Sequence, residues 1–185
     1  MVLIGLTSFN GGGKDVISEY LKKNKGFASI SLSDMLREEC KKRGLALTRD
    51  NLIDMGNELR DKHGLGVLGK LALEKVKLGD NIVITSFRHP NEVFELKKHS
   101  EFVLVKVLAD QKIRFERIKA RNREEDPKTF EEFQKLDLKE VNTSDPHKQK
   151  IDQCVALADF SIINEGSFED LHEKIEELLK NVEAK

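Results

Sequence analysis

The sequence contains few of the residues that mark disulfide-rich, membrane-spanning or single-strand-binding proteins. Its two cysteines, Cys40 and Cys154, lie far apart, so neither a disulfide framework nor a cysteine metal site is expected. No apolar run approaches the ~20 residues that a membrane helix needs. The apolar stretch 2–6 is short and lacks the basic leader of a signal peptide. One tyrosine and no tryptophan leave little for stacking on single strands. We therefore expect a cytoplasmic protein without a membrane partner.

An excess of charge of one sign is also absent. The 185 residues include 32 basic and 33 acidic side chains, for a net charge of −1. Proteins that coat nucleic acid need a strong basic excess, so no nucleic acid polymer is expected as a partner. The length fits one domain with one hydrophobic core. We expect a single domain over residues 1–185, as a monomer or a homodimer.

Short apolar runs alternate with helical patterns along the chain. The runs are almost continuously apolar, which is typical of strands covered on both faces. Alternating strands and helices predict an α/β fold with a parallel sheet. We expect the strand order 2-3-1-4-5, and the last helix, 168–182, to begin with a cap of Ser167 and Asp170. The predicted strands are residues 2–7, 27–32, 81–86, 102–108 and 159–164.

Two stretches interrupt this alternation. Residues 37–78 have almost purely helical patterns, and residues 123–147 are strongly charged. Ligands of open parallel sheets bind beyond the carboxyl ends of the strands. We therefore expect both stretches to be insertions above that edge of the sheet.

A glycine-rich loop follows the first predicted strand and leads directly into a helix. Three successive glycines let the backbone turn its N–H groups toward one centre, and the helix adds its positive N-terminal end. A lysine after these glycines is placed to bridge the β- and γ-phosphates of a nucleotide. The loop and first helical residues are Ser8, Phe9, Asn10, Gly11, Gly12, Gly13, Lys14, Asp15 and Val16.

Three arginines share one face of a later predicted helix. Arg114, Arg117 and Arg121 are spaced three and four residues apart, and Arg123 follows at the start of the charged stretch. Planar guanidinium groups suit bidentate contacts with phosphate and the charge of a transferring phosphoryl group. The alternative is a solvated helix face paired with neighbouring glutamates.

Four segments resemble the nucleoside monophosphate kinase superfamily. Residues 4–14 are similar to the opening of dephospho-CoA kinases, and Gly-Lys-Asp also resembles some deoxynucleoside monophosphate and phosphomevalonate kinases. SLSDMLR at 31–37 resembles the Gly-Asp-Met-Leu-Arg segment of adenylate kinases. TSFR at 85–88 resembles their Asp-Gly-Phe-Pro-Arg. Residues 114–137 and 158–171 resemble an archaeal family of adenylate-kinase-related proteins.

The resemblance implies a P-loop NTPase three-layer sandwich with a five-stranded parallel sheet. Residues 37–78 would be the acceptor-binding insertion and 123–147 an arginine-rich lid. The implied function is Mg²⁺-dependent transfer of a phosphoryl group from ATP to a (deoxy)nucleoside monophosphate or similar small nucleotide. Dephospho-CoA kinase is the alternative enzyme. A non-catalytic nucleotide-binding or regulatory protein is the alternative from another class.

Specific roles follow for the matching residues. Arg60, in the helical stretch, could also line the acceptor pocket. The alternative is that it belongs to a solvated helix face. The expected catalytic residues are Lys14, Asp34, Arg88, Arg117, Arg121 and Arg123. ATP is expected to contact residues 8–16, Asn164 and Gly166. The acceptor is expected to contact Asp34, Arg37, Arg60 and Arg88, and Mg²⁺ to contact Asp15 and Asp34.

Two positions depart from the superfamily pattern. Thr85 stands where an acid usually ends the third strand, and Asp15 stands where a Ser or Thr usually follows the loop lysine. Both positions face the metal in the superfamily. One hypothesis is that the carboxylate has moved from one side of the ion to the other, since Mg²⁺ accepts oxygen ligands of either kind. The rival hypothesis is that the site has lost activity and retains only binding.

Overall fold

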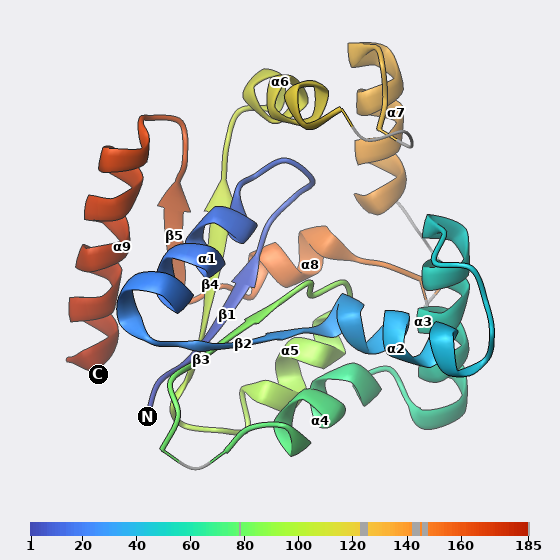
Figure 1. Cartoon of the computed structure of the whole chain (residues 1–185), viewed down its shortest axis with the longest axis horizontal. Helices are drawn as coiled ribbons and strands as arrows, with labels where there is room; N and C mark the ends of the chain where they lie inside the picture. The colour runs from blue at the N-terminus through green and yellow to red at the C-terminus, as the bar shows by residue number, and fades with distance from the viewer. Residues whose placement is uncertain (78, 123–125, 142–144, 146–147, 185) are drawn as a thin grey trace.

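A parallel sheet forms the centre of the computed structural model. The structure describes all residues except 78, 123–125, 142–144, 146–147 and 185. The strand order is β2-β3-β1-β4-β5, and every neighbouring pair is parallel, which confirms the predicted order (Figure 1). The strands are β1 Leu3–Thr7, β2 Ala28–Ser31, β3 Ile82–Thr85, β4 Phe102–Leu108 and β5 Phe160–Ile163.

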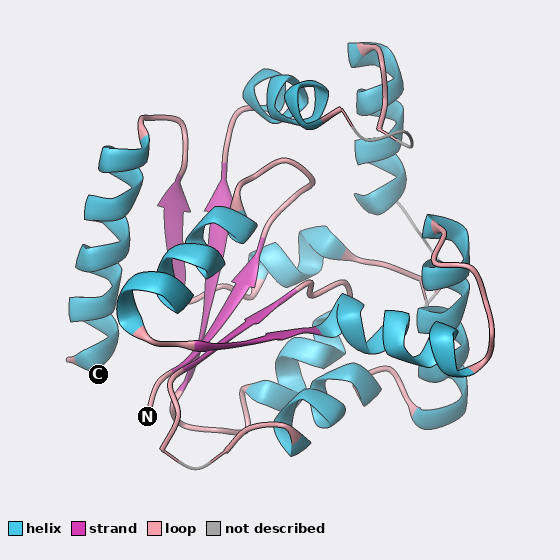
Figure 2. Ribbon diagram, in the orientation of Figure 1, coloured by secondary structure: helices cyan, strands magenta, loops and turns pink. Residues whose placement is uncertain are grey.

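Helices connect the strands and cover the sheet on both faces, so the predicted α/β three-layer sandwich is confirmed (Figure 2). Each strand alternates its side chains between the two layers. In β1, Leu3 belongs to an apolar cluster that also includes residues of α2, α3, α4, α5 and α8, whereas Ile4 and Leu6 belong to a cluster that includes residues of α1 and α9. The helices are α1 Lys14–Lys25, α2 Leu32–Lys42, α3 Arg49–His63, α4 Val67–Glu74, α5 Pro90–Leu96, α6 Gln111–Arg121, α7 Phe130–Val141, α8 Ile151–Ala156 and α9 Phe168–Glu183.

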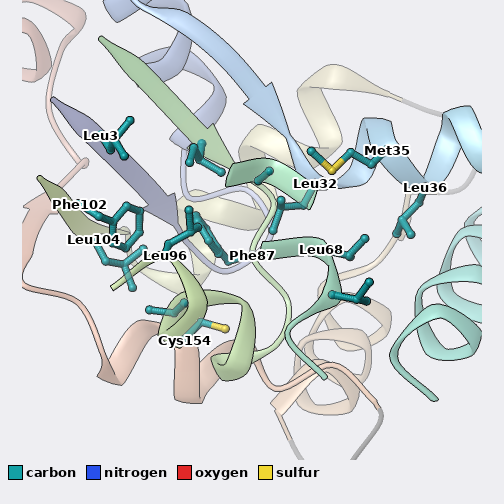
Figure 3. Close-up of a cluster of buried hydrophobic side chains, with 14 of the residues drawn as sticks. Leu3, Leu32, Met35, Leu36, Leu68, Phe87, Leu96, Phe102, Leu104 and Cys154 are labelled. Carbon is teal, nitrogen blue, oxygen red and sulfur yellow. The ribbon is translucent and has the colours of Figure 1, made fainter. Parts of the chain in front are cut away.

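The larger apolar cluster joins the helical insertion to the sheet. Leu32 and Met35 of α2 and Leu68 of α4 are buried together with Phe87 and Phe102 (Figure 3). This packing joins α2 and α4 to one face of the sheet in a single apolar cluster. The insertion is thus attached to the core by a continuous apolar contact.

Differences from the predicted elements are small and concentrate in the charged stretch. Four strands are shorter than predicted by a residue at one or both ends, and the last helix begins as expected, with Ser167 Oγ accepting from the Asp170 N–H at 3.2 Å. Residues 130–141 form α7, which the charged composition did not predict. Its apolar residue Phe133 is buried against Phe115 of α6, so a tertiary contact stabilises this helix. No helix in the described part of the chain has the length and hydropathy required to span a membrane.

Candidate nucleotide and phosphoryl-transfer site

The loop between β1 and α1 has the backbone geometry that its glycines predicted. Gly11 has φ 81° and Gly13, which caps α1, has φ 97°, both in the left-handed region that favours glycine. A Cβ atom on Gly13 would lie 2.1 Å from Asn164 Nδ2. That amide, which follows β5, donates to the Gly12 carbonyl at 3.0 Å and is buried. The loop is therefore shaped locally by glycine and held from the far edge of the sheet by Asn164.

Lys14 lies at the first position of α1, inside a group of charges. Its Nζ is 3.1 Å from Asp15 Oδ1, and its side chain is only 21% exposed. Burial lowers the pKa of the Lys14 ammonium, the Asp15 carboxylate opposes that change, and Arg88 and Arg121 lower the pKa further. An anionic ligand would relieve the repulsion among these three cations. The charge distribution around Lys14 therefore favours phosphate.

One cavity, of about 530 Å³, opens on the α9 side of the loop. Arg117 of α6 lines this cavity. Its Nη2 donates to the Asn164 carbonyl at 2.9 Å, while its buried Nη1 has no hydrogen-bond partner among the described residues. Ile118, Leu171 and the exposed Phe168 give this cavity an apolar end. Apolar surface beside a phosphate loop suits a nucleobase. The cavity is also lined by Asn10, Gly11, Gly12, Gly13, Lys14, Asp15, Val16, Arg121, Asn164, Gly166, Ser167 and Glu169.

A second cavity, of about 750 Å³, lies on the other side of Lys14, under the helical insertion. Arg37 of α2 faces it and donates from Nη1 to Asp34 Oδ1 at 2.8 Å and to Ser33 Oγ at 2.9 Å. Arg88, which follows β3, is another cation of the lining. Leu52 and Ile53 of α3 make part of the wall apolar. The combination of cations, hydroxyls and an apolar wall suits a small phosphorylated molecule.

The two cavities meet at the phosphate loop. Asn10, Lys14, Asp15 and Arg121 line both of them. Arg121, the last residue of α6, lies at this junction. Its guanidinium donates two hydrogen bonds to Asp126, of 2.7 and 2.6 Å. These bonds raise the pKa of Arg121, so the group stays cationic. A molecule in each cavity could therefore meet beside one lysine and one arginine.

Three predicted site residues have surroundings that the sequence did not indicate, and a fourth is not described. Arg60 lines the larger cavity but is 2% exposed, and its guanidinium pairs with Glu92, which is 0% exposed. Arg123 lies outside the described residues. Ser8 and Phe9 line neither cavity: Ser8 is buried, and the Phe9 ring packs 5.4 Å from the Arg114 guanidinium carbon.

The contacts of Arg114 support the phosphate loop from outside the two cavities. Arg114 donates to the Asn10 carbonyl at 3.1 Å and forms a bidentate ion pair with Asp137 of α7, at 2.8 and 2.6 Å. Its guanidinium also lies 5.2 Å from the centre of the Phe133 ring. Arg114 therefore links α7 to the phosphate loop and does not line either cavity.

Oxygen groups suited to Mg²⁺ lie at the cavities. The Asp15 carboxylate is 77% exposed and lines both cavities, and Asp34 and the buried Thr85 line the larger one. Within the part of the chain that the structure describes, no group of three or more His, Cys, Asp or Glu side chains could hold a metal ion. Mg²⁺ commonly completes its ligands with substrate phosphates and water, so the residues present fit an ion that arrives with a nucleotide.

Sequence reasoning missed several residues that contact the predicted site residues. Asp126, Asp137 and Glu92 each bind an arginine of this region, and Phe168 lines the smaller cavity. Ser86, which follows β3, has φ 70°, an uncommon value for a residue other than glycine. Its position directly before Phe87-Arg88 was available from the sequence, but its backbone conformation was not.

Comparisons with known proteins agree with this fold. Residues 4–139 match the family described as "AAA domain". A UPF0200 protein from Thermococcus gammatolerans is 35% identical over 188 residues, covering 98% of this chain and 95% of that protein. A UPF0200 protein from Methanocaldococcus jannaschii is 36% identical, covering 98% and 91%. Shikimate kinase from Acinetobacter baumannii, solved with shikimate, has a TM-score of 0.60 at 18% identity, covering 100% and 96%.

These comparisons support the resemblance read from the sequence only at a coarser level. The structural likeness shows a P-loop kinase-like fold, and at 18% identity it shows the fold alone. The relatives are UPF0200 proteins and not specifically adenylate or dephospho-CoA kinases. The comparisons thus establish a P-loop kinase-like fold.

Proposed function

We propose that this chain, which belongs to the UPF0200 family and contains an AAA domain, transfers a phosphoryl group from ATP to a (deoxy)nucleoside monophosphate or a similar small nucleotide. The observation that carries the proposal is the meeting of two cavities at Lys14, Asp15 and Arg121. The smaller cavity would hold ATP, and the larger cavity the acceptor. We place the reaction in the cytoplasm, as the composition suggests.

The residues at the junction would act by position and charge. A loose phosphoryl transition state needs little covalent help, so catalysis depends on alignment and on stabilising the equatorial oxygens. Lys14 and the N–H groups of the loop would bind the donor phosphates. Arg121, which lines both cavities, would contact the transferring group. Arg37 and Arg88 would bind the acceptor phosphate from the opposite side.

Arg117 and Arg121 would divide the donor side between them. Arg117 is held at the Asn164 carbonyl and keeps a buried donor atom without a partner, so it would bind the nucleotide near the loop. Arg121 pairs with Asp126 and would exchange that carboxylate for phosphate oxygens. Arg123 would extend the same cationic surface, although it lies outside the described residues.

Asp15 and Asp34 would hold Mg²⁺ together with the phosphates. When bound, the ion would offset phosphate charge and orient the donor. Asp34 also lies beside Arg37, so it would help to orient that guanidinium toward the acceptor. Thr85 is neutral, so in this proposal the negative charge beside the ion comes from the α1 side of the site.

A screen of acceptors tests the proposal. The protein would be incubated with γ-labelled ATP, Mg²⁺ and, in separate reactions, each common nucleoside and deoxynucleoside monophosphate and dephospho-CoA. We expect label transfer to at least one monophosphate. Transfer to dephospho-CoA alone would identify the alternative enzyme. ATP binding without transfer to any acceptor would contradict the enzymatic proposal.

A second candidate function follows from Thr85 and Asp15. An acid normally supports the metal at the end of β3, and its replacement by a buried threonine favours a nucleotide-binding protein without turnover. In that case ATP would bind with an affinity that Mg²⁺ changes little. Calorimetry of ATP binding with and without Mg²⁺, alongside the screen, separates the two functions.

A further inference from the structure

The carboxylate of Glu92 joins the helical insertion to the segment that carries Arg88. Its Oε1 accepts from Arg60 Nη2 at 2.8 Å and from Arg60 Nε at 3.3 Å. Its Oε2 accepts from the backbone N–H groups of Arg88, at 2.9 Å, and His89, at 3.1 Å. We call Arg60, Arg88, His89 and Glu92 the Glu92 cluster. Both side chains of its ion pair are almost fully buried, at 2% and 0% exposure.

The backbone around Arg88 is fixed on both sides. The Arg88 N–H is bound to Glu92, and the Arg88 carbonyl accepts from the Lys150 N–H at 2.7 Å. Two residues earlier, Ser86 has φ 70°, an uncommon conformation that persists only where its surroundings hold it. These hydrogen bonds therefore contribute to the direction in which Arg88 leaves the sheet.

The insertion also approaches α5 closely at a second point. A Cβ atom on Gly69 of α4 would lie 2.6 Å from the Glu92 carbonyl oxygen and 3.1 Å from its Cα. No residue with a side chain fits there without a shift of the backbone. Thus α3 reaches Glu92 through Arg60, and α4 touches its main chain directly.

We propose that Arg60 is a positioning residue, which acts through Glu92 to hold the Arg88 segment in place for the acceptor phosphate. The inference rests on the proposed function, because it assigns Arg88 to the acceptor. Arg60 lines the larger cavity, and a direct contact with an acceptor was the expectation from the sequence. Its guanidinium instead gives two N–H groups to Glu92 and one, at 3.4 Å, to Asn57.

A direct contact and a positioning role make opposite predictions for Glu92→Gln. If Arg60 binds the acceptor itself, removing the charge of Glu92 frees the guanidinium, and acceptor binding stays equal or becomes tighter. If Arg60 acts through Glu92, the same change loosens the Arg88 segment and weakens acceptor binding. Glutamine retains an oxygen for the two backbone N–H groups, so this variant is milder than removal of the side chain.

The experiment compares Glu92→Gln and Arg60→Met with Arg43→Met as a matched control. Arg43 belongs to the same insertion and pairs with Glu39 and Glu58, but it lines neither cavity. The first measurement is native-state hydrogen exchange of the Arg88 and His89 amides. We expect roughly tenfold faster exchange in Glu92→Gln and Arg60→Met than in the control, as is typical when a buried hydrogen bond weakens.

The second measurement uses inorganic phosphate as the acceptor probe. A non-hydrolysable ATP analogue with Mg²⁺ first occupies the phosphate loop, and phosphate is then titrated while the Arg88 signals are followed by NMR. We expect Glu92→Gln and Arg60→Met to bind phosphate several-fold more weakly, with unchanged affinity for the ATP analogue. The double variant should be no weaker than the weaker single variant, because both residues act on one segment.

Other results would overturn the inference. Unchanged exchange of the Arg88 and His89 amides would show that Glu92 does not hold them in solution. Faster exchange with unchanged phosphate affinity would reduce Arg60 to a stabilising residue. Tighter phosphate binding in Glu92→Gln would make Arg60 a direct ligand. If the unsubstituted protein bound no phosphate beside the ATP analogue, the acceptor site of the proposed function would fail, whereas amide exchange would still test the Glu92 cluster.

Discussion

The cavities on the two sides of Lys14 differ in what they are made of. The smaller cavity includes one continuous segment, residues 10–16, whose backbone is shaped by glycines with positive φ. The larger cavity collects side chains from α2, α3, the ends of β2 and β3, and α6. A cavity of backbone groups is sensitive to changes of conformation, and a cavity of side chains is sensitive to changes of charge. The two sides of the site should therefore respond differently to substitution.

Lys14→Ala is expected to have the largest effect, because Lys14 lines both cavities. Loss of a charged hydrogen-bond donor should weaken ATP binding by about 100-fold. The fold should remain, since the alanine removes a cation that repels Arg88 and Arg121. Calorimetry measures the affinity, and thermal unfolding monitors the fold. Lys22→Ala, on the exposed surface of α1, is the control. An unchanged ATP affinity in Lys14→Ala would contradict the phosphate-loop assignment.

Arg121→Ala should come next, and its effect should fall on turnover. Arg121 is placed at the junction, where it would contact charge that develops during transfer, and such groups contribute about 100-fold to kcat. ATP affinity should change much less. Steady-state kinetics with the acceptor found in the screen, and calorimetry with ATP, separate the two effects. Lys119→Ala, an exposed cation of the same helix, is the control. Equal turnover in Arg121→Ala and the parent would support the alternative interpretation, in which Arg121 belongs to a solvated helix face.

Gly13→Ala tests the backbone of the smaller cavity by itself, because it changes no charge. An alanine here would have a positive φ and a Cβ atom that collides with Asn164. We expect ATP affinity to fall by roughly tenfold, along with the stability of the protein. Gly26→Ala is the matched control, since Gly26 ends α1 with φ 69° and has no atom within 4 Å of its Cβ position. Gly26→Ala should cost about 1–2 kcal/mol of stability and leave ATP affinity unchanged. Equal losses of affinity in both variants would show that the loop geometry is not specific to binding.

The smallest expected effect concerns the metal. Asp15→Ser should impair metal use and raise the Mg²⁺ concentration that activity requires, because Thr85 offers no replacement charge. Adding Thr85→Asp should recover part of the loss, with a coupling on the order of 1 kcal/mol in a double-mutant cycle. Activity at a series of Mg²⁺ concentrations measures this coupling. Strictly additive effects, or full activity of Asp15→Ser, would leave Asp15 as an acidic residue in the first turn of α1.

The difference between local patterns and long-range contacts explains which features the sequence could predict. The positions of the strands and the loop of residues 8–14 depend on local patterns, namely apolar runs, glycines and a following lysine, and the structure has both. Helix α7 depends on the burial of Phe133 against α6, which a charged local composition conceals. Arg60 has the same local pattern whether it faces solvent, an acceptor or Glu92. Only the packing of α3 and α4 against α5 brings Glu92 within reach, so its partner was not predictable.

The position of β1 affects how the protein can fold during synthesis. β1 comes first among the described strands, yet it lies at the centre of the sheet and pairs with β3 and β4. A nascent chain therefore leaves the ribosome with its loop sequence complete but without neighbouring strands, and such long-range pairing is slow. Asn164, which braces the loop at Gly12, emerges later still. Nucleotide should consequently bind and stabilise the chain only after residue 164 has emerged, so ATP could assist a late step of folding but not an early one.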